Sequence, residues 1–507
     1  MSSSPATEET TKKKPTGITE DYDLWRSYLV RLVIIIFVFA FLCLVIALSL
    51  KLVDCNNNDD TFGWRLVHDG SDNEIDESKK KMNKIAFSFQ SETPTPRAHS
   101  CCSSSPIGNI VGCFGGETMT LDKEKKMNAK TLKGDFWVWS KRNWYNLQMN
   151  ANPENVIPFP IARRNSACWF VNDSTFFLFG GETIDGDLLG DFWVANVNYI
   201  QKYSTWTLLH RGEKMAAFMD ILSTNVTKNV DLTDNFPTAR AHASFSIDGL
   251  KRLWLFGGHS YNLAEKGYYE VNDLWYYSNN KWSIVWICNV KTHCLEKRKS
   301  PLSSPLCKQD SALWITESFD YGIRAYVYGG IKIDSNNVSL QNEMTKSNSS
   351  CYDIELWKWN IDRWEYIPYL QSPIPEKNSM LLRRDCQPLL PTYSLHPQIQ
   401  KQHPGSRIQP CAWMHKDRSL WFFGGSVNTQ NIMADTWSFY PKEKIWKWET
   451  GPIFANVPGV LSSHLYLNNP PALMGSSHWT SAKGQFCIAF GVDYSGVYHG
   501  EVWCLNS

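Results

Sequence analysis

Residues 253–258 read LWLFGG, a short apolar run that ends in two glycines, and residues 420–425 repeat it as LWFFGG. An aromatic residue followed by two glycines occurs five times, and a degenerate sixth copy, interpreted as lacking the second glycine, stands at Phe490-Gly491-Val492. The glycines of the five copies are Gly115, Gly116, Gly180, Gly181, Gly257, Gly258, Gly329, Gly330, Gly424 and Gly425. Successive copies lie 65, 77, 72, 95 and 67 residues apart, and such self-similarity indicates a repeat architecture.

Each copy has the same ordered neighbours. A Pro and an Arg, or a related form, precede five of the copies, as in PTPRAHS, and Lys308 replaces the Arg in the fourth. An acidic residue then leads into a tryptophan, and these tryptophans are Trp137, Trp193, Trp275, Trp357, Trp437 and Trp503. Apolar runs of strand length between Gly, Asn and Asp turns predict short β-strands, with the tryptophans filling the space between sheets.

This pattern resembles the kelch repeat, whose unit is a four-stranded antiparallel blade of a β-propeller. The resemblance covers about residues 61–507. It implies an all-β fold, a six-bladed kelch β-propeller of four-stranded antiparallel blades, preceded here by one transmembrane helix. The Arg and His residues that recur upstream of the glycines are interpreted as structural hydrogen-bonding groups inside each blade; they are Arg97, His99, Arg163, Arg240, His242 and Arg407.

The two ends of the repeat region complement each other. The sixth copy ends at Trp503-Cys504-Leu505 without a final strand, whereas an unassigned strand-like segment, FGWRLV with Trp64, occupies residues 62–67. We expect this N-terminal strand to complete the last blade and close a propeller over residues 62–507, since closure removes an exposed sheet edge. The longer loops should then gather on one face, opposite the face from which the chain enters that strand.

Residues 32–50 read LVIIIFVFAFLCLVIALSL and contain no charge. As a helix they would span roughly 28 Å, close to the hydrocarbon thickness of a bilayer. A buried soluble helix is rarely apolar on every face, and a cleaved signal peptide has a shorter core and a small-residue cleavage site. We therefore predict an uncleaved signal-anchor at 32–50, between a disordered leader (1–31) and a stem (51–61).

The charges beside this segment predict its orientation. Lys12, Lys13, Lys14, Arg26 and Arg31 precede it, so the N-terminus is expected to be cytoplasmic and the propeller extracellular or luminal. Glycosylation sequons, which are used on the extracellular or luminal side, support this orientation. They lie at Asn172, Asn225, Asn337 and Asn348. Thirteen of the 14 cysteines also follow the membrane segment, in a compartment where disulfides persist.

Several cysteines are candidates for disulfides. Cys101 or Cys102 stands opposite Cys113 across a predicted turn, and Cys487 stands opposite Cys504. Cys288 and Cys294 bracket the short segment CNVKTHC, where a disulfide is favoured over a metal site because two further ligands are not evident. Cys55 in the stem is a candidate for an interchain bond that would link a homodimer.

The composition excludes some classes of function. The formal net charge is only +1, which argues against a nucleic-acid binder with a broad basic face. No phosphate-binding glycine loop, nucleophile elbow or metal-binding motif is present, so we assign no catalytic, cofactor-binding or metal residue. The resemblance to kelch propellers implies interaction or adhesion, with a protein or glycan as the partner.

An enzyme is the alternative function. Some kelch-like propellers are catalytic, including copper-radical galactose oxidases and sialate mutarotases. An oxidase of that kind would need Tyr, Cys and His residues that converge near the ring axis, and His259, Tyr261 and His499 are the candidates. A purely structural ring that supports maturation of other proteins is a third interpretation.

Overall fold

The structure is a computed structural model. It describes residues 62–69, 93–122, 127–151, 159–212, 236–262, 267–287, 304–305, 307–318, 322–332, 351–368, 388–393, 402–428, 430–462 and 467–506. The chain divides into two compact units, Met1–Thr61 and Phe62–Ser507, and every described residue belongs to the second. Within the described ranges, no helix has the length and apolarity to cross a bilayer. The predicted leader, membrane helix and stem (1–61) lie outside these ranges.

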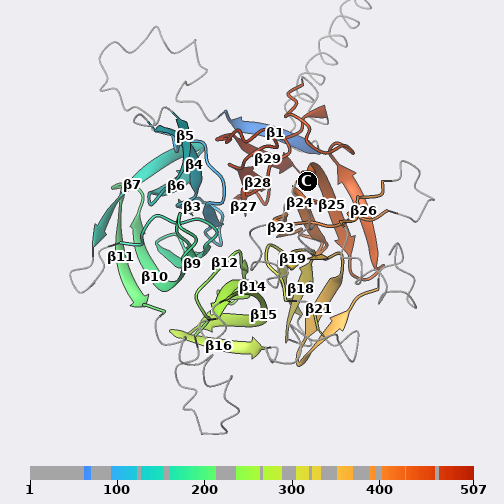
Figure 1. The fold of residues 1–507 in the computed structure, drawn as a ribbon, viewed down its shortest axis with the longest axis horizontal. Coiled ribbons are helices and arrows are strands. Elements are labelled where there is room, and N and C mark those ends of the chain that lie inside the picture. Colours follow the sequence, from blue (N-terminus) through green and yellow to red (C-terminus); the bar gives the residue numbers. More distant parts are fainter. Residues whose placement is uncertain are drawn as a thin grey trace, which may run out of the picture. The chain divides into compact units, whose positions relative to one another are not determined.

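The second unit is all-β, with propeller-like sheets that surround a common centre (Figure 1). Three of its sheets are four-stranded and antiparallel. The first has the order β1(Gly63–His68), β29(Val502–Asn506), β28(Phe486–Ala489) and β27(Ser477–Thr480). The second comprises β17(Ala312–Ser318), β18(Gly322–Tyr328), β21(Leu356–Asn360) and β22(Arg363–Tyr366). The third comprises β23(Cys411–Met414), β24(Leu420–Ser426), β25(Ile432–Tyr440) and β26(Ile445–Thr450).

The remaining strands form the other half of the ring. An eight-stranded sheet consists of two four-stranded sets whose last strands, β7 and β11, pair in parallel. The first set is β2(Cys101–Ser104), β3(Ile110–Phe114), β6(Phe136–Ser140) and β7(Asn143–Ala151), and the second is β8(Ala167–Asn172), β9(Thr175–Glu182), β10(Leu188–Asn198) and β11(Tyr203–His210). A further sheet contains β12(Arg240–Ala241), β13(Ser244–Ile247), β14(Leu253–Asn262), β15(Gly267–Ser278) and β16(Lys281–Trp286).

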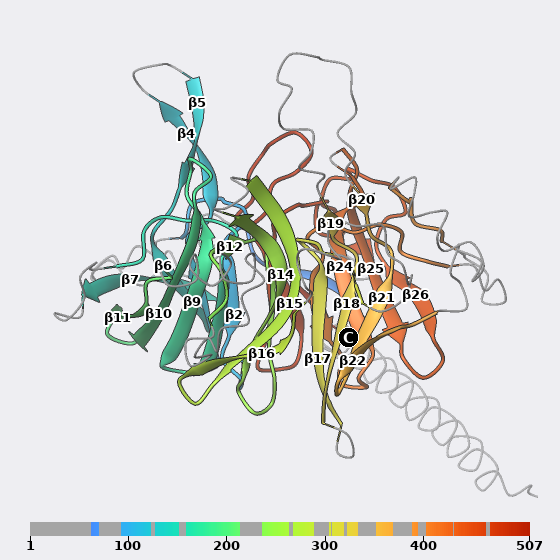
Figure 2. The ribbon, with the colours of Figure 1, turned by 60° about the horizontal axis from the view of Figure 1, so that its bottom comes forward.

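Hairpin ribbons extend beyond the glycine pairs. β4(Glu117–Asp122) pairs with β5(Met127–Leu132), and β19(Ile331–Lys332) pairs with β20(Cys351–Tyr352). The distal halves of β14 and β15 continue in the same way, with Asn262 opposite Gly267. Figure 2 shows the β4–β5 and β19–β20 ribbons on the same face of the ring.

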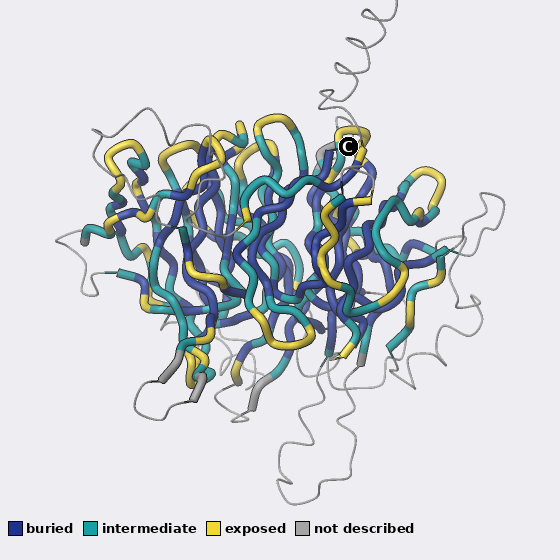
Figure 3. Tube along the Cα trace, turned by 90° about the horizontal axis from the view of Figure 1, so that it is seen from above, coloured by how far each residue is buried: buried dark blue, intermediate teal, exposed yellow. Residues whose placement is uncertain are grey.

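Inner strands are buried on both surfaces, which explains their continuous apolar sequences. All five residues of β3 (IVGCF) and of β6 (FWVWS) are buried. A sheet with one solvated face would alternate apolar and polar residues, whereas a sheet packed on both sides favours unbroken apolar runs. In Figure 3 the strands carry most of the buried residues, and the exposed residues lie mainly in the turns.

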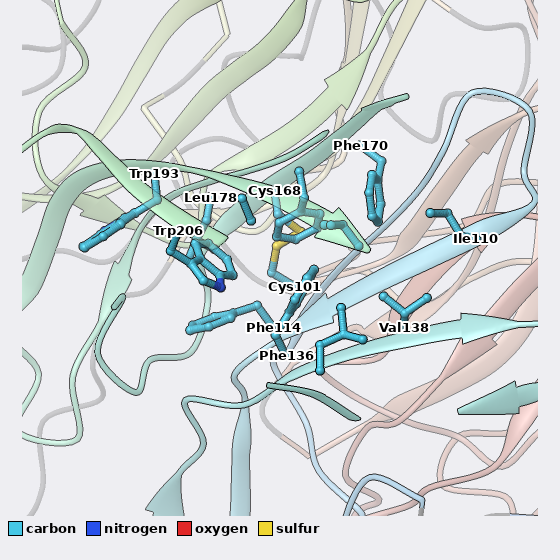
Figure 4. Close-up of a cluster of buried hydrophobic side chains, with 14 residues drawn as sticks. Cys101, Ile110, Phe114, Phe136, Val138, Cys168, Phe170, Leu178, Trp193 and Trp206 are labelled. Carbon is cyan, nitrogen blue, oxygen red and sulfur yellow. A yellow bond between two sulfur atoms is a disulfide. The ribbon is translucent and has the colours of Figure 1, made fainter. Parts of the chain in front are cut away.

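Six buried apolar clusters stand between consecutive sets of strands in the described chain. Figure 4 shows the cluster that joins the β2–β7 set to the β8–β11 set, where Trp206 packs edge-on against Phe114 at 5.4 Å and Phe136 at 5.3 Å. Another cluster joins the last set, through Trp479 and Phe490, to the first, through Trp144. Each set therefore packs on both of its neighbours around the ring.

The tryptophans that the sequence assigns to the repeat lie in these clusters. Trp64, Trp137, Trp193, Trp275, Trp357, Trp437 and Trp503 are all buried, with at most 5% of each side chain exposed. Four of them also use their Nε1–H groups: Trp137, Trp193, Trp275 and Trp437 donate to the aspartate two residues earlier at 2.7–2.8 Å. The same aspartates pair with the upstream arginines.

The N-terminal strand completes the last sheet. β1 pairs antiparallel with β29, and Trp64 stands opposite Leu505. Because Gly63 pairs with Asn506, the chain enters β1 at the end where β29 finishes. That end carries the short turns of the hairpins, such as Asn279–Asn280 between β15 and β16. The ribbons that follow the glycine pairs stand at the opposite end of the strands.

The glycine pairs provide close approach between neighbouring sets. Gly115 has φ +69° and Gly116 has φ +103°, and a Cβ on Gly115 would lie 2.4 Å from the carbonyl oxygen of Arg163 in the next set. The sixth copy corrects the sequence interpretation that it lacks the second glycine. Gly491 donates to Arg97 O just as Gly116 donates to Arg163 O, so Gly491 is the second glycine. Phe490, at φ +64°, occupies the place of the first.

Buried ion pairs stabilise five of the sets, whereas Leu473 occupies the Arg position of the last one. The guanidinium of Arg240 donates to both carboxylate oxygens of Asp273 at 2.7 and 2.8 Å and to Gly257 O at 3.1 Å. Arg97–Asp135, Arg163–Asp191 and Arg407–Asp435 repeat the pairing. In the fourth copy, two acidic residues share the role that a single aspartate has elsewhere. Asp353 binds Lys308 at 2.7 Å, and Glu355 accepts the hydrogen bond of Trp357. These arginines have the structural role that the repeat indicates.

Candidate functional site

Six residues at equivalent positions meet at the centre of the ring. Each lies two residues after the Arg position of its repeat, and we call them the axial cluster: His99, Asn165, His242, Asp310, Gln409 and Gly475. All six have left-handed backbone conformations, with φ between 53° and 68°. The fold therefore uses one backbone geometry at this position while the side chains differ.

Backbone hydrogen bonds connect the cluster into a chain around the axis. His99 N donates to Gly475 O at 2.8 Å, and Asn165 N donates to His99 O at 3.0 Å. His242 N, Asp310 N and Gln409 N each donate to the preceding member's carbonyl at 2.9–3.1 Å. Residues far apart in the sequence become immediate neighbours in this way.

The conformation is costly mainly for one of these residues. Asn, Asp, His and Gly enter the left-handed region comparatively easily. Gln409 does so at a cost of about 1–3 kcal/mol, and the ring geometry holds it there.

His242 is the cationic centre of the cluster. Its Nδ1 lies 2.9 Å from Asp310 Oδ1, and its Nε2 lies 3.4 Å from Glu182 Oε1. Burial lowers the pKa of His242, but Asp310 and Glu182 outweigh burial and raise that pKa to about 10. His242 is therefore protonated at neutral pH and carries hydrogen on both ring nitrogens. The two carboxylates also accept hydrogen bonds from amides: Asn165 Nδ2 donates to Glu182 Oε1 at 2.9 Å, and Gln409 Nε2 donates to Asp310 Oδ1 at 3.0 Å.

His99 has the opposite protonation state. Burial, and then the positive charge of His242, lower the pKa of His99 to about 4. Its neutral ring lies over Gly475, where a Cβ would stand 2.5 Å from His99 Cε1. The glycine of the sixth repeat thus leaves room for the imidazole of the first. His99 Nδ1 is buried and has no hydrogen-bond partner.

Further charged residues stand directly after the glycine pairs. Glu117 and Glu182 follow Gly116 and Gly181. Arg164 bonds both carboxylates, with an Nε–Oε1 distance of 2.8 Å to Glu182. Lys130 also contacts Glu117 at 2.9 Å, and Tyr498 donates to it. Burial raises the pKa of Glu117, but Tyr498, Lys130 and Arg164 together lower that pKa to about 2.

A cavity of about 130 Å³ lies beside the axial cluster. All six axial residues line it, together with His478 and the serines Ser100, Ser166, Ser244, Ser311 and Ser476. Ser166 Oγ and Gln409 Oε1 are buried without hydrogen-bond partners, as is His99 Nδ1. A polar cavity at the centre of the ring is a candidate ligand site.

The sequence-based interpretation missed this site. It read His99 and His242 with the arginines as structural groups inside each blade, but both histidines face the axis. The available signal was the contrast between two positions of the repeat. The first position is Arg in four repeats and Lys in one, whereas the residue two places later is His, Asn, His, Asp, Gln or Gly. A position that varies within a regular scaffold is where specificity resides.

The residues considered for an oxidase do not line the cavity. His259 and Tyr261 lie in β14, and His499 precedes β29, with its Nδ1 3.1 Å from Glu501. His259 Nδ1 lies 3.7 Å from Glu270. In the part of the chain that the structure describes, no group of three or more His, Cys, Asp and Glu residues is arranged to hold a metal ion.

Disulfide bonds are present in the described chain. Cys102 bonds Cys113 and Cys487 bonds Cys504, each across a hairpin. Cys101 bonds Cys168, which joins two neighbouring sets, and the sequence did not suggest this pair. Cys411 is buried and carries a free thiol. Cys55, Cys288 and Cys294 lie outside the described residues.

One of the predicted glycosylation sites is visible. Asn172 is exposed at the end of β8, where its side-chain oxygen accepts a hydrogen bond from Ser174 N at 2.9 Å. An attached glycan would therefore project into solvent. Asn225, Asn337 and Asn348 lie outside the described ranges.

Comparisons with known proteins find similarity at the level of structure only. No family model matches the chain, and no curated protein matches it in sequence. Among solved structures, 280 chains are similar. One of them, described as "Structure of YjhT", matches with a TM-score of 0.41 and 12% identity over 81% of this chain and 95% of that chain. No family membership follows from these matches.

Proposed function

We propose that residues 62–507 form a closed six-bladed propeller of the kelch type that acts as a binding module for a protein or glycan partner. Six apolar clusters between strand sets and the six axial positions support the blade number. The pairing of β1 with β29 supports closure by the N-terminal strand. The Arg–Asp–Trp network supports the kelch assignment, because these are the residues that define the repeat.

The axial cluster carries the proposal of binding. Its members share one backbone geometry but differ chemically, whereas the scaffold residues around them are repeated. A rigid ring that presents one specific site is expected to combine repeated scaffold residues with different side chains at its axis. The ribbons β4–β5 and β19–β20 lie on one common face, where they extend the surface available to a partner.

We further propose that the protein is a type II membrane glycoprotein anchored by residues 32–50. The charge-free segment and its basic N-terminal flank support this topology, as do the disulfides, which persist in oxidising compartments. Because the chain enters β1 from the short-turn end, the ribbon-bearing face would point away from the membrane. This orientation makes the ribbon-bearing face available to partners.

Engineered glycans can test which face binds. Asp185→Asn with Asp187→Thr creates a sequon in the turn between β9 and β10, on the ribbon-bearing face. Lys281→Ser creates one beside the turn between β15 and β16, at the short-turn end. The full-length chain on cultured cells would be probed with arrayed glycans and with soluble ectodomains.

We expect a binding signal that the first glycan abolishes and the second leaves unchanged. A signal blocked only by the glycan at Lys281→Ser would contradict the proposed face. Finding no ligand in either array, together with chemical conversion of a substrate by the purified chain, would replace the binding role with an enzymatic one.

A further inference from the structure

The hairpin turns at the short-turn end of the strands are rich in exposed basic residues. The described turns at this end are residues 105–109, 141–142, 173–174, 199–202, 248–252, 279–280, 361–362, 415–419, 441–444 and 481–485. Their exposed basic residues are Lys141, Arg142, Lys202, Lys251, Lys416, Arg418, Lys442, Lys444 and Lys483. Their exposed acidic residues are Asp173, Asp362, Asp417 and Glu443. Nine positive charges therefore stand against four negative ones, although the formal net charge of the whole chain is only +1.

Large aliphatic side chains project from the same turns. Four of them are between 62% and 80% exposed, namely Ile107, Ile200, Leu250 and Ile361. The tips of tight turns usually carry Gly, Asn, Asp, Pro or Ser, whose backbone preferences suit the turn. Ile200 lies two residues before Lys202, and Leu250 lies directly before Lys251. This end of the ring thus combines apolar tips with positive charges, opposite the β4–β5 and β19–β20 ribbons (Figure 2).

Ile361 shows that such a tip is costly. It has φ +61°, and β-branched residues rarely adopt the left-handed conformation. In the turn between β15 and β16, Asn279 and Asn280 have φ +50° and +58°, and asparagine enters this region far more easily. The backbone and the solvent both disfavour an exposed isoleucine at position 361. A side chain that is retained at such a cost indicates a contact outside the ring.

The two kinds of side chain together specify the surface that this end would meet. Lys and Arg bind anionic lipid headgroups, while aliphatic side chains enter the boundary between headgroups and acyl chains. A sulfated glycan would use the positive charges but would leave the aliphatic tips in water, so a lipid surface fits the observations better.

The path of the chain points to the same surface. Gly63 pairs with Asn506, so the chain enters β1 at the short-turn end. The charge-free segment 32–50 precedes β1 in the sequence by only 12 residues. If that segment spans a bilayer as proposed, the short-turn end is the part of the ring that comes nearest to the lipid.

We propose that the short-turn end docks on a phospholipid bilayer that contains anionic lipids, with its basic turn residues at the headgroups and its aliphatic tips in the interface. This inference goes beyond the proposed partner binding, which uses the opposite face, and it rests on the proposed anchor to bring the ring to the bilayer. Docking fixes the tilt of the ring and holds the ribbon-bearing face away from the membrane.

Two methionines provide native probes for the test. Met414, the last residue of β23 at the short-turn end, is 42% exposed, and Met119 in the β4 ribbon is 39% exposed. Peroxide converts an accessible methionine to its sulfoxide, and mass spectrometry measures the rate at each position. The full-length chain would be compared in detergent, in nanodiscs of phosphatidylcholine, and in nanodiscs of phosphatidylcholine with phosphatidylserine.

Docking should protect only one of the two methionines. In discs with phosphatidylserine, Met414 should be oxidised about threefold or more slowly than in phosphatidylcholine discs or detergent, since several cations contribute to the contact. Molar salt should restore the faster rate, because it screens the charges. Met119 should be oxidised at the same rate in all samples.

The aliphatic tips can be removed without changing charge. Ile200→Asn combined with Ile361→Asn should lose most of the protection of Met414, and asparagine suits the left-handed backbone at position 361. Ile161→Asn combined with Ile184→Asn is the matched control, because these isoleucines are 48% and 49% exposed near the opposite end of the strands. It should keep the protection. Equal oxidation rates of Met414 in detergent would show that both variants are folded.

Equal oxidation of Met414 in both kinds of disc, with the chain retained in the discs, would overturn docking while leaving the anchor intact. Protection that survives in the Ile200→Asn and Ile361→Asn variant would also overturn it. Heparin that protects Met414 in detergent as strongly as phosphatidylserine does in discs would assign the surface to a soluble polyanion instead. A chain that remains with neither kind of disc would contradict the anchor, and the proposal with it.

Discussion

The guanidinium of Arg240 shows how a single residue stabilises its set of strands. It is 1% exposed, and its bonds to both oxygens of Asp273 and to the Gly257 carbonyl leave little of its hydrogen-bonding capacity unused. Similar pairs recur in other repeats, so the contribution is multiplied around the ring. Buried charges are tolerated in this way only when each has its partner.

Replacing Arg240 with Met should therefore be severely destabilising. The substitution keeps an apolar stem but leaves the Asp273 carboxylate buried without its counter-charge, which costs about 3–5 kcal/mol. The free energy of unfolding in urea would measure the effect. Arg363→Met is the control, because Arg363 is 74% exposed and lies 3.7 Å from Glu365, and its loss should change stability by less than about 0.5 kcal/mol.

Gly475 offers a second residue-scale test. Both Gly475 and Gly186 have positive φ, at +68° and +87°, but a Cβ on Gly475 would lie 2.5 Å from the His99 ring, whereas nothing lies within 4 Å of one on Gly186. Gly475→Ala should therefore lower the unfolding free energy about 1–3 kcal/mol more than Gly186→Ala, since overpacking adds to the backbone strain that both share. Equal losses in the two variants would contradict the steric role of Gly475.

Residue types alone could predict the scaffold but not the axial site. Arg240, Asp273 and Trp275 recur with fixed spacing, so their shared role is visible in the sequence. His99 and His242 stand beside such arginines and were read as part of the same pattern. Their common position at the axis becomes evident only when the ring brings six positions together, a long-range effect that spacing along the chain does not encode.

At the scale of elements, the short strand β1 has a large effect on the fold, because it completes the last sheet of the ring. This six-residue strand is the first described strand of the chain, yet it forms the outer strand of the sheet that contains the C-terminal β29. The apolar run around Trp64 and the missing last strand of the sixth repeat predicted this pairing. Strand β12 and the parallel contact between β7 and β11 were not predicted, because two-residue strands and contacts between sheets leave no periodic signal.

Trp64→Ala tests the contribution of β1. Trp64 is fully buried and packs edge-on against Phe423 at 4.8 Å and Phe486 at 6.2 Å, so it connects two sheets. Truncation should cost about 3–5 kcal/mol in unfolding free energy through the cavity that it leaves. Trp448→Ala, at a half-buried tryptophan of β26, should cost clearly less. Comparable losses would show that β1 is not essential to closure.

The disulfides differ in what they constrain. Cys101–Cys168 spans 67 residues and joins two sets of strands, whereas Cys102–Cys113 spans 11 residues within one hairpin. The entropy of the unfolded chain predicts stabilisation of roughly 4 kcal/mol for the longer loop and roughly 3 kcal/mol for the shorter. Replacing both members of each pair with Ala and comparing urea midpoints should rank the variants in that order. The reverse ranking would contradict the entropic account.

For the whole molecule, closure of the ring makes the axial cluster a junction of all the strand sets. The backbone bonds between neighbouring members run through His99, Asn165, His242, Asp310 and Gln409. The composition and repeat could predict a ring, but not the charge balance at its centre, since that balance depends on which six residues meet. Protonation at the axis should consequently affect the stability of the entire propeller.

The pH dependence of stability should show a maximum near pH 6.5. The folded pKa of His242 is raised to about 10, so the stability that it contributes is complete below its unfolded pKa of 6.5 and is lost as the pH rises toward 10. The folded pKa values of His99 and His478 are lowered to about 4, so their contribution is complete above pH 6.5 and is lost as the pH falls toward 4. Each group contributes a slope of at most about 1.4 kcal/mol per pH unit.

Urea denaturation of the full-length chain between pH 5 and pH 10 measures the loss of stability on both sides of this maximum. His242→Asn is the informative variant, because Asn165 already occupies the equivalent position in the second repeat with the same left-handed backbone. It should be less stable at neutral pH, because Asp310 loses its cationic partner, and the difference from the unmodified chain should shrink as the pH rises from 6.5 toward 10. His415→Asn controls for a histidine that does not line the axial cavity. A difference that stays constant over this range would show that His242 is not protonated in the folded ring.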